Sequence, residues 1–96
     1  MYLEIVSPEA TLFSGDVESV TVPGIEGSFQ MLNNHAPIVS SLKQGTVIIK
    51  GSLTLSEQQK AVFKQEGGET LLDITSGTVE MSQNKLILLT LSLIHI

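Results

Sequence analysis

Turn-forming residues recur along this chain at intervals of about 8 to 12 residues, and this spacing constrains the possible folds more than any other feature. Pro23-Gly24, Lys50-Gly51, Glu66-Gly67-Gly68 and Ser76-Gly77 are the clearest of these signals. The segments between them are short and rich in apolar or β-branched residues, which favour strands. The pattern predicts an all-β protein, a sandwich or barrel of antiparallel strands.

The first two predicted strands show the period-2 alternation of a sheet with one buried face. Leu3 and Ile5 flank Glu4 in the first strand. In the second, Val20 and Val22 share one face. These four aliphatic side chains are therefore expected to point into the core.

Two further predictions concern turns and helices. Ser14-Gly15-Asp16 and Ser76-Gly77 consist of residues typical of turns, so the chain is expected to reverse at both places. No window of helical length combines helical apolar spacing with a cap at its start. The best window, residues 56–66, begins with a possible N-cap at Ser56 but has too few apolar residues on one face. It is predicted to be a hairpin region.

The composition excludes several classes of function. The chain has 96 residues, enough for one domain with a single core. Its net charge is -5 with only five Lys and Arg residues, which argues against nucleic acid as a partner. It has no cysteine, so it offers neither a disulfide nor a thiolate metal site. The apolar run at residues 86–96 is about half of the ~20 residues that a membrane helix needs.

Patterns that carry catalytic or metal chemistry are weak. His35 and His95 are far apart in the sequence, and neither has a carboxylate three or four positions later, so no metal site is predicted. The serines lack the sharp turn of a nucleophile elbow, and the glycines of residues 24–27 do not lead into a phosphate-binding helix. The acidic residues are spread singly. The sequence predicts no catalytic residue and no cofactor, which leaves a surface for other proteins.

The order of motifs then identifies a family. The run IVSPEATLFSGDVESVTVPGIEGSFQMLNNHAPIVSSLKQGTV, from Ile5 to Val47, resembles the N-terminal β-sandwich domain of the epsilon subunit of bacterial F-type ATP synthase. The later run SGTVEMSQNKLILL, Ser76 to Leu89, is similar to the closing hairpin of that family. The resemblance implies a ten-stranded antiparallel β-sandwich over residues 1–89, in a short form without the two C-terminal helices of the family. Residues 90–96 do not resemble the family and are predicted to be a separate apolar tail.

The resemblance also implies a role. The chain is expected to be a rotor subunit of the central stalk that docks the gamma subunit to the c ring and supports proton-driven ATP synthesis by mechanical coupling. It would catalyse nothing itself. It would lie on the cytoplasmic face of the bacterial inner membrane, a peripheral position reached only through the c ring.

The resemblance carries six site residues onto this sequence. The expected gamma-subunit contacts are Ser7, His35 and Ser40, and the expected c-ring-facing hairpin holds Glu26, Gly27 and Ser28. Residues 33–37, Asn-Asn-His-Ala-Pro, are expected to form a rigid surface corner. Many relatives carry an acid where this chain has Ser28, so Glu26 is expected to substitute for it.

One alternative from another class stays open at this point. The chain could be a stand-alone small β-sandwich that binds a ligand. Such a module needs a concave, aromatic-lined pocket, and one Tyr and three Phe residues make this pocket hard to build.

Overall fold

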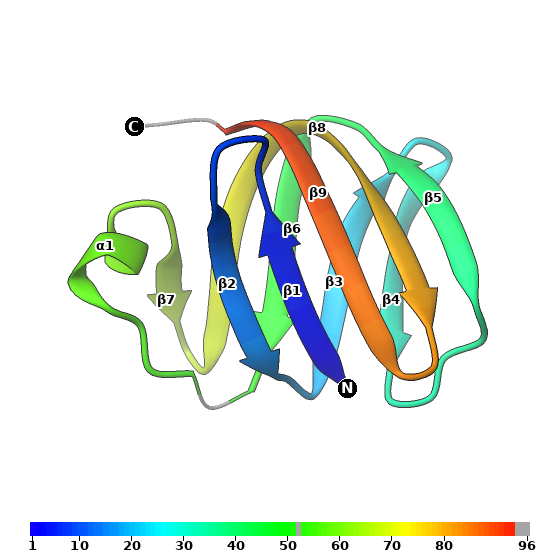
Figure 1. The fold of residues 1–96 in the computed structure, drawn as a ribbon, viewed down its shortest axis with the longest axis horizontal. Coiled ribbons are helices and arrows are strands. Elements are labelled where there is room, and N and C mark those ends of the chain that lie inside the picture. Colours follow the sequence, from blue (N-terminus) through cyan, green and yellow to red (C-terminus); the bar gives the residue numbers. More distant parts are fainter. Residues whose placement is uncertain (52, 94–96) are drawn as a thin grey trace.

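Two layers of β-strands face each other across one apolar core (Figure 1). The computed structural model describes residues 1–51 and 53–93. The elements are β1 (Tyr2–Val6), β2 (Thr11–Asp16), β3 (Ser19–Gly24), β4 (Gly27–Leu32), β5 (Ile38–Leu42), β6 (Gly45–Lys50), α1 (Glu57–Lys60), β7 (Lys64–Glu66), β8 (Glu69–Ser82) and β9 (Lys85–Leu93). The all-β sandwich prediction is confirmed, with nine strands in the described residues against the ten expected. No helix in these ranges is long and apolar enough to span a membrane.

Strand β8 joins the two layers. Its first half pairs with β6 and β7, and its second half pairs with β5 and β9. The hydrogen-bonded path runs β2-β1-β9-β8-β5-β3-β4. Every described pair of strands is antiparallel except β1 and β9, which run parallel. The first strand thus lies beside the last one, and the chain closes on itself.

The core is built by the alternating positions that the sequence indicates. Leu3, Ile5, Val20 and Val22 are all fully buried, as predicted. Other strands contribute further aliphatic side chains, and Leu72 on the first half of β8 is one of them. Because strands alternate their side chains between two faces, one face of each layer packs inward and the other stays available for contacts.

The turn predicted at Ser76-Gly77 is wrong. This dipeptide lies inside β8, where the ladder with β9 shifts register on both sides of Ser76. The strand changes its neighbour there, from β6 along residues 69–74 to β5 along residues 77–81. A Cβ on the glycine would collide with the carbonyl oxygen of Leu89. The turn-prone residues therefore supply a bulge and a close backbone approach instead of a reversal.

The turn predicted at Ser14-Gly15-Asp16 is also wrong. These residues end β2 and pair with β1, with Gly15 opposite Leu3 and Asp16 opposite Tyr2. The pairing with β1 holds the glycine extended, so the local preference for a turn loses to a ladder formed with a distant segment.

The hairpin predicted for residues 56–66 is wrong in its first half, which forms the single turn of α1. The Ser56 hydroxyl accepts a hydrogen bond from the Gln59 backbone N–H at 3.2 Å. The Gln59 side-chain oxygen accepts one from the Ser56 N–H at 2.9 Å. This capping box stabilises a helix that buries no residue of its own, which is why the apolar pattern did not predict it.

The segment around α1 covers the open side of the sandwich next to edge strand β2 (Figure 1). The Gln59 side-chain amide donates to the Leu12 carbonyl oxygen at 3.2 Å. Phe63 packs edge-to-face on Phe13, with ring centroids 6.3 Å apart. These contacts occupy an edge that would otherwise present unpaired backbone groups.

The predicted boundary after Leu89 falls inside β9. Residues 90–93 continue the strand, with Thr90 opposite Gly77 and Leu93 opposite Ile74. Residues 94–96 lie outside the described residues. The separate origin of the tail stays a prediction.

Candidate protein-interaction site

The hairpin between β3 and β4 is short and firmly attached. Gly24 pairs with Gly27, so Ile25 and Glu26 form its tip. Gly27 has a φ of 131°, which requires glycine. The Ile25 N–H donates to the Ser41 carbonyl oxygen at 3.1 Å, and this bond ties the tip to β5. The tip is therefore a rigid projection.

A hollow of about 410 Å³ lies between this tip and β5. It is lined by two kinds of side chain, the apolar ones of Ile25, Phe29, Ile38 and Val39 and the polar ones of Glu26, Ser40 and Ser41, together with Gly24 and Gly27. Ile25 is 60% exposed and Val39 is 75% exposed. Glu26 is the one ionisable residue of this lining, so the hollow combines apolar surface with a single negative charge.

The hollow brings together site residues that the sequence assigned to two partners. Glu26 and Gly27, expected to face the c ring, line it from the tip, and Ser40, expected to face gamma, lines it from β5. Ser28 follows the tip and is exposed. One predicted gamma contact, Ser40, is thus a neighbour of the predicted c-ring hairpin.

His35 lies in a pinned loop between β4 and β5. Its N–H donates to the Leu32 carbonyl oxygen at 3.1 Å. Its ring Nδ1 lies 2.7 Å from the Ala36 carbonyl oxygen. The preceding Asn34 has a φ of 60°, and its N–H donates to Oδ1 of Asn84 at 2.7 Å. The expected surface corner is therefore present, and it is held by the end of β4 and by the turn between β8 and β9.

Ser7 lies in the turn after β1, where its hydroxyl serves the turn itself. The oxygen accepts the N–H of Ala10 at 3.2 Å and that of Glu9 at 3.4 Å. The same hydroxyl donates to the Ala10 carbonyl oxygen at 3.2 Å. Both the backbone and the side chain of Ser7 are thus committed to the turn, and the residue presents this turn to its surroundings.

The structure does not bring Ser7 and His35 together. The His35 loop is attached to Asn84, whose carbonyl oxygen accepts the N–H of Tyr2 at the start of β1. Ser7 follows the other end of β1. Because a strand rises about 3.3 Å per residue, the five residues of β1 separate the two places by roughly 15 Å.

An exposed sheet face extends between these two places, and the sequence analysis missed it. One row of paired residues crosses four strands, from Val39 on β5 through Glu80 and Ile87 to Glu4 on β1. Ile87 is 37% exposed, and Leu91, further along β9, is 57% exposed. The sequence did contain a signal for this face. In the run KLILLTLSL, apolar residues occupy both odd and even positions, which predicts a strand with apolar side chains on both faces.

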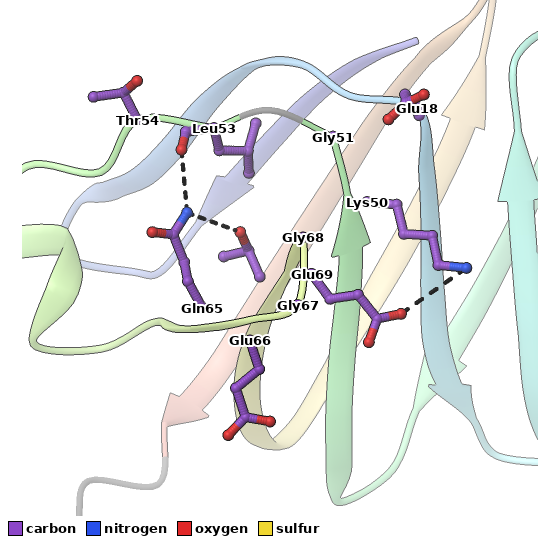
Figure 2. Close-up of a pocket in the computed structure, with 11 residues that line it drawn as sticks. Glu18, Lys50, Gly51, Leu53, Thr54, Gln65, Glu66, Gly67, Gly68 and Glu69 are labelled. Atoms are coloured by element: carbon purple, nitrogen blue, oxygen red, sulfur yellow. Dashed lines mark hydrogen bonds and ion pairs between the residues drawn. The ribbon is translucent and has the colours of Figure 1, made fainter.

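A second, larger hollow lies elsewhere and is polar. It has a volume of about 780 Å³ and lies beside the hairpin between β7 and β8 (Figure 2). In this hollow the Lys50 Nζ and Glu69 Oε2 atoms lie 3.9 Å apart. The Gln65 side-chain amide donates to the Leu53 carbonyl oxygen at 3.1 Å. None of its lining residues is aromatic. It does not have the aromatic lining that the ligand-binding alternative requires.

Metal binding has no support in the part of the chain that the structure describes. No group of three or more His, Asp or Glu side chains there is placed to hold an ion. His95 lies outside the described residues.

A rigid β-sandwich with exposed apolar side chains on one sheet face and a projecting hairpin defines a small protein-interaction domain. A family model described as "ATP synthase, Delta/Epsilon chain, beta-sandwich domain" matches residues 1–96, and the chain belongs to this family. It is 42% identical over 88 residues to the ATP synthase epsilon chain of Chlorobium limicola, covering 92% of this chain and 85% of the relative. It is 41% identical to that of Chlorobaculum tepidum, with the same coverage.

Solved structures share the fold at lower identity. A chain in the central stalk and c-ring structure of Tetrahymena thermophila mitochondrial ATP synthase superposes with a TM-score of 0.73 at 18% identity. A chain of the Euglena gracilis mitochondrial enzyme superposes with a TM-score of 0.71 at 17% identity. The matches cover 99% and 97% of this chain, but 66% and 51% of those chains.

Proposed function

We propose that this chain is the epsilon-type rotor subunit of a bacterial F-type ATP synthase, part of the central stalk, where it docks the gamma subunit to the c ring. It is a non-catalytic subunit that supports proton-driven ATP synthesis by mechanical coupling. The observation that carries this proposal is family membership over the whole chain, with relatives that are named as ATP synthase epsilon chains.

The architecture suits the transmission of torque. Strand β8 belongs to both layers, so one layer cannot slide over the other without breaking its ladders. The hydrogen bond from the Ile25 N–H to Ser41 and that from the Lys43 N–H to Pro23, at 2.9 Å, fasten the hairpin tip to β5. Packed protein interiors have low compressibility, so force applied at the tip reaches the rest of the sandwich.

The contacts with gamma are assigned to one side of the molecule. Val39 and Ile87 supply exposed apolar area on this face, the His35 loop and Ser7 lie near the two ends of β1, and Ser40 lines the hollow beside Val39. Interfaces gain most from such apolar area when a polar rim surrounds it.

The contact with the c ring is assigned to the hairpin tip. Ile25 and Glu26 project there and are exposed, and Ser28 adds a hydroxyl. Glu26 supplies the negative charge that a basic group of a c-ring loop would pair with. Through this contact the subunit is peripheral to the membrane, on the cytoplasmic face of the bacterial inner membrane.

Cysteine cross-linking tests this assignment, because the chain has no cysteine and each introduced thiol is unambiguous. Ser40→Cys is expected to cross-link to gamma and Ser28→Cys to the c subunit in the assembled complex. Lys64→Cys, exposed on β7 across the molecule, is the control and is expected to cross-link to neither (Figure 1). Failure of the wild-type chain to assemble with gamma and the c ring would contradict the proposed function.

A further inference from the structure

The His35 ring has one nitrogen whose role is decided by its neighbour. Nδ1 lies 2.7 Å from the Ala36 carbonyl oxygen, which is hydrogen-bonding distance. A carbonyl oxygen only accepts hydrogen bonds, so Nδ1 must carry the proton. In a neutral imidazole the other nitrogen, Nε2, then has no proton and holds a lone pair.

The backbone around His35 restricts where this lone pair points. The His35 N–H is bonded to the Leu32 carbonyl oxygen, and the Asn34 N–H is bonded to Asn84, so the loop is fastened on both sides. Pro37 fixes the following backbone dihedral. On this fastened backbone, the bond from Nδ1 to Ala36 orients the ring before any partner arrives, and less conformational entropy is lost when one binds.

Nε2 is the ring atom left for a partner. Within residues 1–51 and 53–93, no hydrogen bond to His35 Nε2 occurs, and no buried side-chain nitrogen or oxygen lacks a hydrogen-bond partner. Nε2 is consequently not a buried orphan but a surface acceptor. The Ala and Pro residues that follow His35 have no side-chain donor that could occupy it.

We propose that His35 selects a hydrogen-bond donor on the gamma subunit through Nε2 of its neutral ring, with Nδ1 anchored on Ala36. The group that matches the neutral ring is an amide, hydroxyl, ammonium or guanidinium N–H or O–H, whereas a carboxylate would need Nε2 to carry a second proton. This inference rests on the proposed function. It adds the chemical class of the group on gamma and the His35 atom that accepts a hydrogen bond from it.

Two substitutions separate the two ring nitrogens. The side-chain oxygen of Gln reaches about as far as Nε2, and that of Asn reaches about as far as Nδ1. His35→Gln is therefore expected to bind gamma within about twofold of wild type. His35→Asn and His35→Ala both lose the outer acceptor, and their dissociation constants are expected to rise roughly 3- to 10-fold, the range of one neutral hydrogen bond.

The dissociation constant for gamma also supplies the control and the results that would contradict the inference. Gln58→Asn, an exposed change on α1 across the molecule, is expected to leave the dissociation constant unchanged. The inference is overturned if Asn preserves binding and Gln does not, or if all three His35 variants bind like wild type. Circular dichroism of each variant checks that the fold is retained.

A second measurement does not depend on gamma. Long-range ¹H–¹⁵N correlation spectra of the free chain at pH about 9, where imidazoles are neutral, report which nitrogen carries the proton. The Nδ1–H form of His35 is expected to dominate, and dominance of the Nε2–H form overturns the inference. A wild-type chain that does not bind gamma overturns the proposed function instead, so the two failures are distinguishable.

Discussion

Asn84 holds Asn34, fifty positions away in the sequence, through a 2.7 Å hydrogen bond from the Asn34 N–H to Oδ1 of Asn84. Asn84 itself lies in the turn between β8 and β9 with a φ of 59°, a conformation that asparagine tolerates better than most residues. One side chain thus shapes the closing hairpin and fastens the loop that carries His35.

Replacing Asn84 should reveal both roles. Asn84→Gly keeps the permitted backbone conformation and removes the hydrogen bond, so the free energy of unfolding is expected to fall by about 1 kcal/mol. Asn84→Ala also strains the backbone, and a further loss of about 1 kcal/mol is expected. Urea unfolding measures both changes. Equal stability of the Gly variant and wild type would show that the bond contributes nothing net.

Gly77 should not tolerate a side chain. The added Cβ of Gly77→Ala meets the backbone carbonyl oxygen of Leu89, which cannot rotate away as a side chain can. The free energy of unfolding is expected to fall by more than about 2 kcal/mol. Gly67→Asn is the matched control, because Gly67 has a φ of 54° and open space around it. It should change stability by less than about 1 kcal/mol, and a similar loss at both positions would argue against the close approach in β8.

Strand β9 offers a paired test of its two faces. Leu88 is fully buried and Leu91 is 57% exposed. Leu88→Ala is expected to lower the free energy of unfolding by about 2 to 5 kcal/mol, since it leaves a cavity in the core. Leu91→Ala should cost less than about 1 kcal/mol. Comparable losses would mean that β9 does not present these two faces as described.

The exposed apolar side chains of the row, Val39 and Ile87, should matter for binding and not for folding. Val39→Asp puts a charge at a side chain that is 75% exposed in the free chain and is buried in the proposed gamma interface. Its dissociation constant for gamma is expected to rise roughly 10-fold or more, because an unpaired charge would lose its water. Isothermal titration calorimetry measures this, with thermal unfolding as the check on the fold.

A matched charge change elsewhere completes that test. Gln58→Asp introduces the same charge on the exposed face of α1, across the molecule from β5 (Figure 1). It is expected to leave gamma binding unchanged. If Val39→Asp and Gln58→Asp affect the dissociation constant equally, the row is not part of the gamma contact.

Much of the fold was predictable from local patterns. The alternation at Leu3, Ile5, Val20 and Val22 correctly predicted buried positions, because a strand with one face in the core must repeat every second residue. The motif order correctly predicted the family. The gamma and c-ring assignments of individual residues stay predictions.

The failures share one physical cause. Ser76-Gly77 is turn-prone by itself, and whether it turns or bulges depends on strands β5, β6 and β9, which come from distant parts of the sequence. The single turn of α1 is stabilised by its capping box and by the Gln59 contact with Leu12 on β2, and an apolar pattern records neither. Local propensity contributes fractions of a kcal/mol per residue, and nonlocal pairing overrides it.

The sequence by itself therefore determined the class of fold, the alternating core and the family, because these follow from periodicity and motif order along the chain. Only the tertiary structure decided which site residues meet. It placed Ser40 beside Glu26 at one hollow and separated Ser7 from His35 by the length of β1. Strand pairing sets these distances, and the pairing partners lie too far apart in the sequence for any local pattern to specify them.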